Sequence, residues 1–432
     1  ISRRIPRRNT TWRRASQPRP PNSRRYGMLG LIGSASGRVD FAMKPFALLL
    51  LVLVLPTWGR AERPYFGAEP GALEKAKQAI AAGDPVLVGA LKKLKQDAEK
   101  ALLVAPASVT EKKQLPPSGD AHDYMSLAPY FWPNPDTKDG LPYIRKDGKT
   151  NPEVNDYKDK EYMPALCAEV EKLALAFYFT GDEKYAKHAT TLLRVWFLDE
   201  ATKMNPNLNF GQAVKGQNDG RGAGLIDTRH FIKVIEAVGL MQSSNSWTPS
   251  NNKALQAWFG SFLEWMQTSK NGTDEMKATN NHGVWYDAQR LSFALYTNNT
   301  VLAKKVVANV KKRIGSQMDK NGFFPAELAR TTSLHYSLFV VEPLVKIAQM
   351  SSTIGIDLWQ YTAPNGNSIK KGCDVLIPYL TGEKAWTGEQ IKPFNFDEPL
   401  EFFAEISKKY NCPACDKKIT EISNTKYIPL QI

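Results

Sequence analysis

Apolar residues recur every three or four positions over most of the chain after residue 72, the spacing of helices with one buried face. A first pair of predicted helices carries Leu73, Ala76 and Ile80, and then Leu87, Leu91 and Leu94. Between them, Gly83-Asp84-Pro85 predicts a helix end followed by a new start, with Asp84 as N-cap and Pro85 in the first turn.

Further helices are predicted at 161–180, 182–198, 227–240, 251–267, 281–296, 298–314, 333–350 and 399–408. Asp227, Asn251, Asn281 and Asn298 are expected to cap four of them. Helices joined by short turns pack as antiparallel hairpins, and alternating strand patterns are scarce. The pattern predicts an all-α fold, an (α/α) toroid or incomplete barrel built of antiparallel helical hairpins. A fixed repeat period is missing, which disfavours a solenoid.

Two long segments interrupt the helical pattern, at 115–153 and 203–224. The first is rich in Pro, Gly, Asp and aromatic residues, and the second in Asn and Gly. Loops of such length within a domain usually have a task, so we expect a lid or a substrate wall.

The N-terminal region predicts export. A short basic start at Met43, nine apolar residues at 47–55 and small residues before position 62 have the form of a signal peptide at 43–61. A transmembrane anchor is the alternative reading. Residues 1–42 are expected to be a non-native or disordered leader, and 62–432 to be a single toroid domain with a cysteine-containing C-terminal tail.

Charge and cysteines add two points. Residues 1–60 carry 12 Lys and Arg and one acid, so most of the net charge of +14 comes from the leader, which argues against a nucleic-acid partner. The cysteines are Cys167, Cys373, Cys412 and Cys415. Cys412-Pro-Ala-Cys415 could be a redox pair or half of a zinc site, but we expect a structural disulfide involving this tail, with the pairing open.

The candidate chemistry lies at two predicted helix starts, around Asn281-His282 and around Arg330 and Tyr336. Phosphate loops, GxSxG elbows and metal-ligand clusters are not apparent. A uronate loses its C5 proton more easily when donors neutralise its carboxylate, and amide, imidazole and guanidinium groups are suitable donors. A tyrosine that is ionised or polarised by cations can take that proton and return one to the glycosidic oxygen, which completes a β-elimination.

Several segments resemble the signatures of the alginate lyase superfamily of α/α-toroid polysaccharide lyases. They are Asn280-Asn281-His282 with Trp285, the 330–337 segment, the 126–135 segment and Asn151-Pro152-Glu153, within a similarity from about residue 68 to 399. The resemblance implies metal-independent β-elimination, with Tyr336 as base and acid and with Asn281, His282 and Arg330 neutralising the carboxylate. Where a linkage requires a separate base, His282 is the available one.

Seven further residues are candidates for substrate binding: Arg229, His230, Tyr130, Trp132, Asn280, Trp285 and His335. Each also has a structural reading. Tyr130 and Trp132 could stack on sugar rings or only pin the loop to the body, and a histidine near a helix start could be packed or act as a cap.

We therefore expect a secreted or periplasmic, monomeric lyase of an acidic uronic-acid polymer. Mannuronate-rich alginate is the first substrate and glucuronan the alternative. No cofactor, metal, nucleic acid or lasting membrane insertion is expected. Other readings are a toroid glycoside hydrolase, with Asp227, Asp287 and Glu327 as candidate acids, and a non-catalytic uronan-binding protein.

Overall fold

The computed structural model describes residue 66 and residues 71–425, which fall in the compact unit Gly59–Ile432. The unit Ile1–Trp58 lies outside the described residues, as do the predicted leader at 1–42 and the predicted signal peptide at 43–61. Within the described range, every helix is too short or too polar to span a bilayer.

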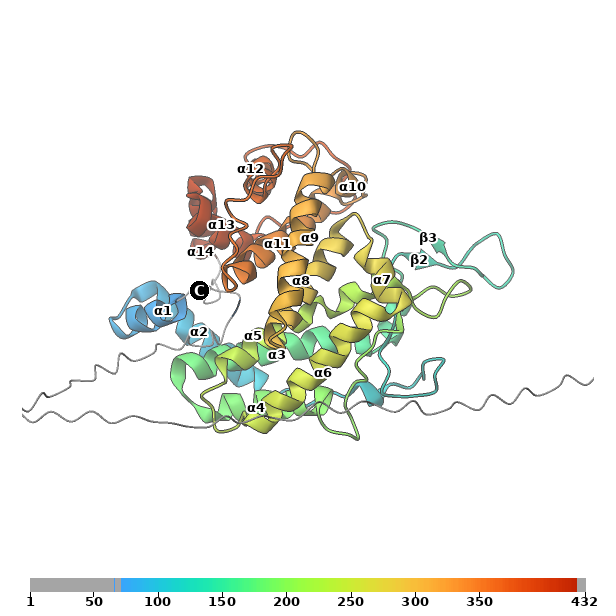
Figure 1. The fold of residues 1–432 in the computed structure, drawn as a ribbon, viewed down its shortest axis with the longest axis horizontal. Helices are drawn as coiled ribbons and strands as arrows, with labels where there is room; N and C mark the ends of the chain where they lie inside the picture. Colours follow the sequence, from blue (N-terminus) through green and yellow to red (C-terminus); the bar gives the residue numbers. More distant parts are fainter. Residues whose placement is uncertain (1–65, 67–70, 426–432) are drawn as a thin grey trace, which may run out of the picture. The chain divides into compact units, whose positions relative to one another are not determined.

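The described residues form an α/α toroid of helical hairpins with a few short strands, which confirms the predicted fold class (Figure 1). The helices are α1 (Ala72–Ala81), α2 (Pro85–Ala101), α3 (Asp159–Thr180), α4 (Glu183–Phe197), α5 (Phe231–Leu240), α6 (Pro249–Thr268), α7 (Lys270–Met276), α8 (Asn281–Tyr296), α9 (Thr300–Gln317), α10 (Pro325–Leu328), α11 (Ser333–Ser352), α12 (Ile369–Leu380), α13 (Leu400–Tyr410) and α14 (Pro413–Thr425). The short helices α7, α10, α12 and α14 were not predicted.

Inner and outer helices differ in how much of their circumference is apolar. Helices α5 and α8 are buried on nearly every side, whereas α4 and α9 expose a polar face. A helix that is buried all round belongs to the interior of a domain. Helix α8 packs against α9, α11 and α5, and α5 also packs against α3, so the inner helices contact one another.

A cluster of aromatic side chains joins α4, α5, α6 and α8. Phe259 lies at its centre, with ring centroids 4.9 Å from Phe293 and 5.2 Å from Trp258, and Phe197 and Phe231 complete it. Edge-to-face and offset pairs of this kind add to the stabilisation from buried area. The cluster fixes the position of α8, which carries Asn281 and His282 at its start.

The two predicted loops are joined to each other by short strands. Strand β1 (Met125–Leu127) pairs in parallel with β4 (Phe210–Ala213), and β2 (Phe131–Trp132) pairs antiparallel with β3 (Ile144–Arg145). The 3-10 helices η1 (Val109–Glu111), η2 (Pro152–Asp156) and η3 (Gly222–His230) flank them. Asp227 of η3 accepts hydrogen bonds from Ser126 and Gln212 and an ion pair from Lys160, which ties both loops to the helices.

The predicted caps need correction at four helix starts. Helix α6 begins two residues earlier than predicted and is capped by Thr248, and α9 is capped by Asn299 instead of Asn298. Asp227 lies inside η3, and α5 begins after it. Asn281 is the first helical residue of α8, whose N-cap is Asn280. A side-chain oxygen at any of several neighbouring positions can cap a helix, so tertiary packing selects the start.

The cysteine tail forms the expected disulfide, with Cys412 bonded to Cys415 at the start of α14. Both are buried against the core. Cys167 and Cys373 are free thiols buried within α3 and α12.

Candidate functional site

Tyr336 lies in the first turn of α11, where only 8% of its surface is exposed. Its hydroxyl lies 2.8 Å from the hydroxyl of Tyr130, which the long loop carries between β1 and β2. From the sequence, Tyr130 was expected either to stack on sugar rings or to pin the loop to the body. The structure instead brings the two phenols, more than two hundred residues apart, into direct hydrogen-bond contact.

Arg330 lies flat against the face of Tyr336, with its guanidinium carbon 3.5 Å from the ring centroid. Asp147 of the long loop holds that guanidinium from the other side, accepting from Nε at 3.0 Å and from Nη2 at 2.8 Å. The Thr331 amide donates to the same carboxylate at 3.2 Å. Gly148 permits this approach, because a Cβ there would collide with the Thr331 hydroxyl and its φ is +69°.

The charges of this group are interdependent. Burial raises the pKa of the Asp147 carboxyl, but the bonds from Arg330 and Thr331 outweigh it and hold the pKa well below its usual range. Burial also raises the pKa of Tyr336, and the neighbouring Tyr130 adds to that rise while Arg330 opposes it. With its pKa raised above the usual value, Tyr336 carries its proton at neutral pH, and of the two expected states, ionised or polarised by cations, the contact with Arg330 favours the polarised phenol.

Asn281 and Glu327 form a buried pair beside this cluster. The Asn281 backbone amide and Nδ2 donate to the Glu327 carboxylate at 2.6 Å and 2.8 Å, and both residues are 0% exposed. A carboxylate at the first turn of a helix is favoured by the helix dipole. Burial raises the pKa of Glu327, although the bonds from Asn281 and the charges of Arg330 and His282 oppose the rise.

His282 forms a dyad with Glu275 of α7, whose side chain is almost fully buried. The imidazole Nδ1 lies 2.7 Å from the Glu275 Oε1 atom, and 22% of the His282 side chain is exposed. A carboxylate at Nδ1 fixes the tautomer in which Nδ1 carries the proton, so that Nε2 presents a lone pair. The dyad thus offers an oriented proton acceptor near Glu327 and Arg330.

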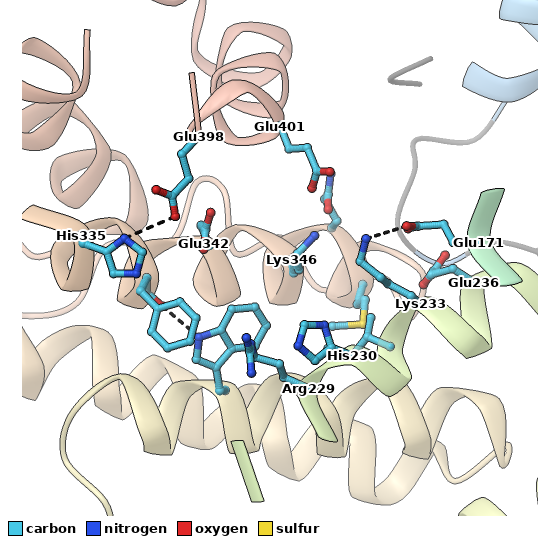
Figure 2. A pocket seen from close by; sticks show the side chains of 15 residues that line it. Glu171, Arg229, His230, Lys233, Glu236, His335, Glu342, Lys346, Glu398 and Glu401 are labelled. Atoms are coloured by element: carbon cyan, nitrogen blue, oxygen red, sulfur yellow. Dashed lines mark hydrogen bonds and ion pairs between the residues drawn. The ribbon is translucent and has the colours of Figure 1, made fainter. Parts of the chain in front are cut away.

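Four of the predicted substrate-binding residues line one cavity of about 330 Å³: Arg229, His230, Trp285 and His335 (Figure 2). Trp285 donates from Nε1 to the Phe339 carbonyl at 3.0 Å, and the Arg229 guanidinium lies 5.4 Å from the Phe339 ring centroid. Burial, together with nearby Arg229, lowers the pKa of His230 to about 3, so His230 is neutral.

The remaining two candidates have structural contacts. Trp132 donates from Nε1 to the Lys149 carbonyl at 2.8 Å, and the Lys146 ammonium lies 5.4 Å from its ring centroid. This geometry pins the loop to itself. Asn280 is the N-cap of α8, but its side chain makes no capping bond there.

Two residues of the candidate site were not predicted from the sequence. Asp147 belongs to the irregular Lys146-Asp147-Gly148 turn, and Glu275 precedes His282 by seven residues on a short unpredicted helix. Neither position has a periodic or motif signal. A buried carboxylate facing a candidate base or guanidinium becomes recognisable only when the partners are seen together.

The three acids considered for hydrolysis are buried, and each is engaged by other groups of the protein. Asp227, Asp287 and Glu327 are at most 1% exposed, and Asp287 accepts from the Arg313 Nε at 2.7 Å. Paired carboxylates that flank a glycosidic bond must face the substrate. Among the described residues, no group of three or more His, Cys, Asp or Glu side chains is placed to hold a metal ion.

The family profile and the solved structures that match this chain agree with each other. The profile of the family described as Alginate lyase matches residues 108–386. The crystal structure of an alginate lyase from Bacteroides ovatus matches with a TM-score of 0.78 and 40% identity, covering 83% of this chain and 94% of that chain. Alginate lyase A1-III from Sphingomonas species A1 matches with a TM-score of 0.53 and 17% identity, covering 82% and 90%. At that identity the likeness concerns the fold alone. The curated proteins contain no match.

Proposed function

The chain belongs to the alginate lyase family and is a polysaccharide lyase, and from this premise we propose that it cleaves a uronic-acid polymer by metal-independent β-elimination. Mannuronate-rich alginate is the first substrate we propose, and glucuronan is the second. The observation that carries the proposal is the contact of Tyr336 with both the Tyr130 hydroxyl and the Arg330 guanidinium. Glu327, whose pKa responds to the charges of both Arg330 and His282, connects this contact to the His282–Glu275 dyad.

Some N–H groups of the proposed substrate donors already bind carboxylates of the protein, and others are left for the substrate. Arg330 uses Nε and Nη2 to bind Asp147, which leaves Nη1 for a substrate carboxylate. Asn281 has a second Nδ2 proton besides the one that it gives to Glu327, and the His282 imidazole adds a donor at Nε2 only when it is protonated. Preformed donors aimed at a carboxylate stabilise the charge that develops when C5 loses its proton. Each such donor is typically worth about 3–4 kcal/mol of the barrier.

Proton transfer follows from the protonation states. Tyr336 holds a proton in the resting enzyme, so it can deliver one to the leaving glycosidic oxygen. In mannuronate the C5 proton and the leaving oxygen lie on the same face of the ring, so that one phenol can serve both. Tyr336 releases its proton to solvent as the substrate binds, takes the C5 proton as a phenolate, and then returns that proton to the leaving oxygen. In guluronate they lie on opposite faces, and the C5 proton then goes to Nε2 of His282.

The test offers polymannuronate, polyguluronate and glucuronan separately and follows the ultraviolet absorbance of the unsaturated uronate product. We expect a rise with at least one polymer, in the presence of a chelator as well. Tyr336→Phe should lower the rate by about 10²–10³ or more on every substrate. His282→Ala should do so most strongly on polyguluronate. New reducing ends without the absorbance would refute elimination and favour hydrolysis, and tight binding without either signal would favour a non-catalytic protein.

Export is a separate proposal that rests on the sequence alone. The apolar segment within 43–61, which lies outside the described residues, supports a secreted or periplasmic protein. N-terminal sequencing of the protein recovered after expression from Met43 in an exporting host should find a start near Glu62. A cell-associated protein that retains the segment would favour an anchor instead. We further propose that the mature lyase is a monomer, which light scattering measures directly.

A further inference from the structure

The cavity of about 330 Å³, shown in Figure 2, is connected to Tyr336 through two residues of α11 that line it. His335 and Phe339 line the cavity, and their ring centroids lie 5.9 Å and 6.3 Å from that of Tyr336. The other walls come from α3, η3, α5, α8 and the start of α13. The cavity wall and Tyr336 therefore share the first turns of α11, which places this space within reach of a polymer bound at Tyr336.

Its size and lining suit a short piece of sugar chain. Small-molecule sites span about 300–1,000 Å³, so this cavity has room for roughly one or two hexuronate residues. Trp285 and Phe339, with ring centroids 5.3 Å apart, give it an apolar aromatic side, and polar groups converge from the other walls. That mixture is typical of sites for small polar ligands.

Two cations face the cavity without a direct ion pair to a carboxylate of the described residues. Lys233 is paired with Glu171 at 2.5 Å, but Arg229 and Lys346 make no ion pair with any carboxylate of the described residues (Figure 2). Arg229 donates one bond to the Ile226 carbonyl, which leaves the rest of its guanidinium for a ligand. Glu342 and Glu401 act on Lys346, and Asp227 and Glu342 act on Arg229, only at longer range. Both cations therefore keep donors for an anionic ligand.

The same cavity has more acidic than basic side chains, which limits how many uronate groups can enter it. Three Lys and Arg side chains line the cavity, and so do five glutamates. The glutamates are Glu171, Glu236, Glu342, Glu398 and Glu401. Like charges repel strongly where water is partly excluded. Carboxylates accept hydrogen bonds from sugar hydroxyls, so they suit a sugar end, but they oppose the entry of further uronate groups.

We propose that this cavity is the terminal subsite of the lyase, where roughly one or two uronate residues at a chain end bind with Arg229 and Lys346 on their carboxylates. The glutamates bar a longer polyanion, so the enzyme releases short products from chain ends. The proposal rests on the proposed function and adds the mode of action to it.

The experiment follows product size, viscosity and ultraviolet absorbance during digestion of polymannuronate by the full-length protein. Monomers and dimers should appear from the first minutes, while viscosity falls slowly relative to the ultraviolet signal. A rapid fall in viscosity with a broad ladder of oligomers would overturn the inference and leave the proposed function intact. Absence of any ultraviolet signal with all three uronans would instead refute the proposed function.

Two variants test the residues. Lys346→Met should raise KM for a tetrauronate about tenfold, with kcat changed much less, since one charge-assisted bond is lost. The matched control is Lys253→Met, at an exposed position on α6. Removing two charges in Glu398→Gln/Glu401→Gln should lengthen the products. An unchanged KM in a folded Lys346→Met protein, or unchanged products in the double variant, would overturn the assignment.

Discussion

Asp147 offers the sharpest test of how the reactive tyrosine is held, because Asp147→Asn removes its charge with little change in shape. The wild-type carboxylate accepts two bonds from Arg330 and one from the Thr331 amide, and Arg330 in turn covers the Tyr336 ring. Asparagine retains one oxygen acceptor and presents an NH₂ group where Arg330 donates. The guanidinium should therefore leave the face of the phenol.

The magnitude follows from the bonds lost. A hydrogen bond to a charged group contributes about 1.5–3 kcal/mol net, and 1.36 kcal/mol corresponds to tenfold in rate. Asp147 is partly exposed, so solvent screens some of this energy. We expect kcat to fall about tenfold to hundredfold, with a smaller change in KM, because Asp147 acts through Arg330 and does not touch the substrate.

The assay is initial rate by ultraviolet absorbance across pH. On polymannuronate the phenolate must form before it takes the C5 proton, and Arg330 opposes the raised pKa of Tyr336, so displacement of Arg330 should move the rising limb of the rate profile to higher pH. Asp136→Asn, at an exposed position of the same loop, is the control and should behave as wild type. Unchanged kcat in Asp147→Asn would refute the positioning role. A gain in kcat/KM would mean that Asp147 competes with the substrate for Arg330.

Three further outcomes are expected. Glu275→Gln should lower kcat on polyguluronate about tenfold or more by freeing the imidazole tautomer of His282, and retention of the wild-type rate would contradict the dyad. Burial raises the pKa of Glu342 to about 7, so its ionisation adds negative charge to the cavity as pH rises. KM for a tetrauronate should therefore increase from pH 6 to about 8. Glu342→Gln should flatten that rise in KM. The charged groups that face Glu342 remain in that variant: Lys346, His335, Glu398, Glu401 and Arg229. Phe259→Ala should cost about 3–5 kcal/mol in denaturant unfolding, and a loss below 1 kcal/mol would contradict the packing role of the aromatic cluster.

The helices and the two chemically able helix starts could be predicted because their signals are local. Three- and four-residue spacing of apolar side chains is a property of contiguous sequence, and the 281–296 and 333–350 predictions match α8 and α11 closely. Helix starts were less predictable. At Asn298 and Asn299, two adjacent caps of nearly equal quality differ only in how the turn packs.

By itself, the sequence determined the fold class, the family and the presence of Tyr336, Arg330, Asn281 and His282 at two helix starts. Only the tertiary structure decided their partners: the phenol of Tyr130 and the carboxylates that orient or neutralise each group. Tyr130 and Asp147 come from a loop far along the chain from Tyr336 and Arg330, and Glu275 comes from a short helix close to His282 in the sequence; in neither segment does periodicity constrain a residue. The protonation of Tyr336 was likewise decided by burial, a property of the packed protein that no stretch of sequence contains.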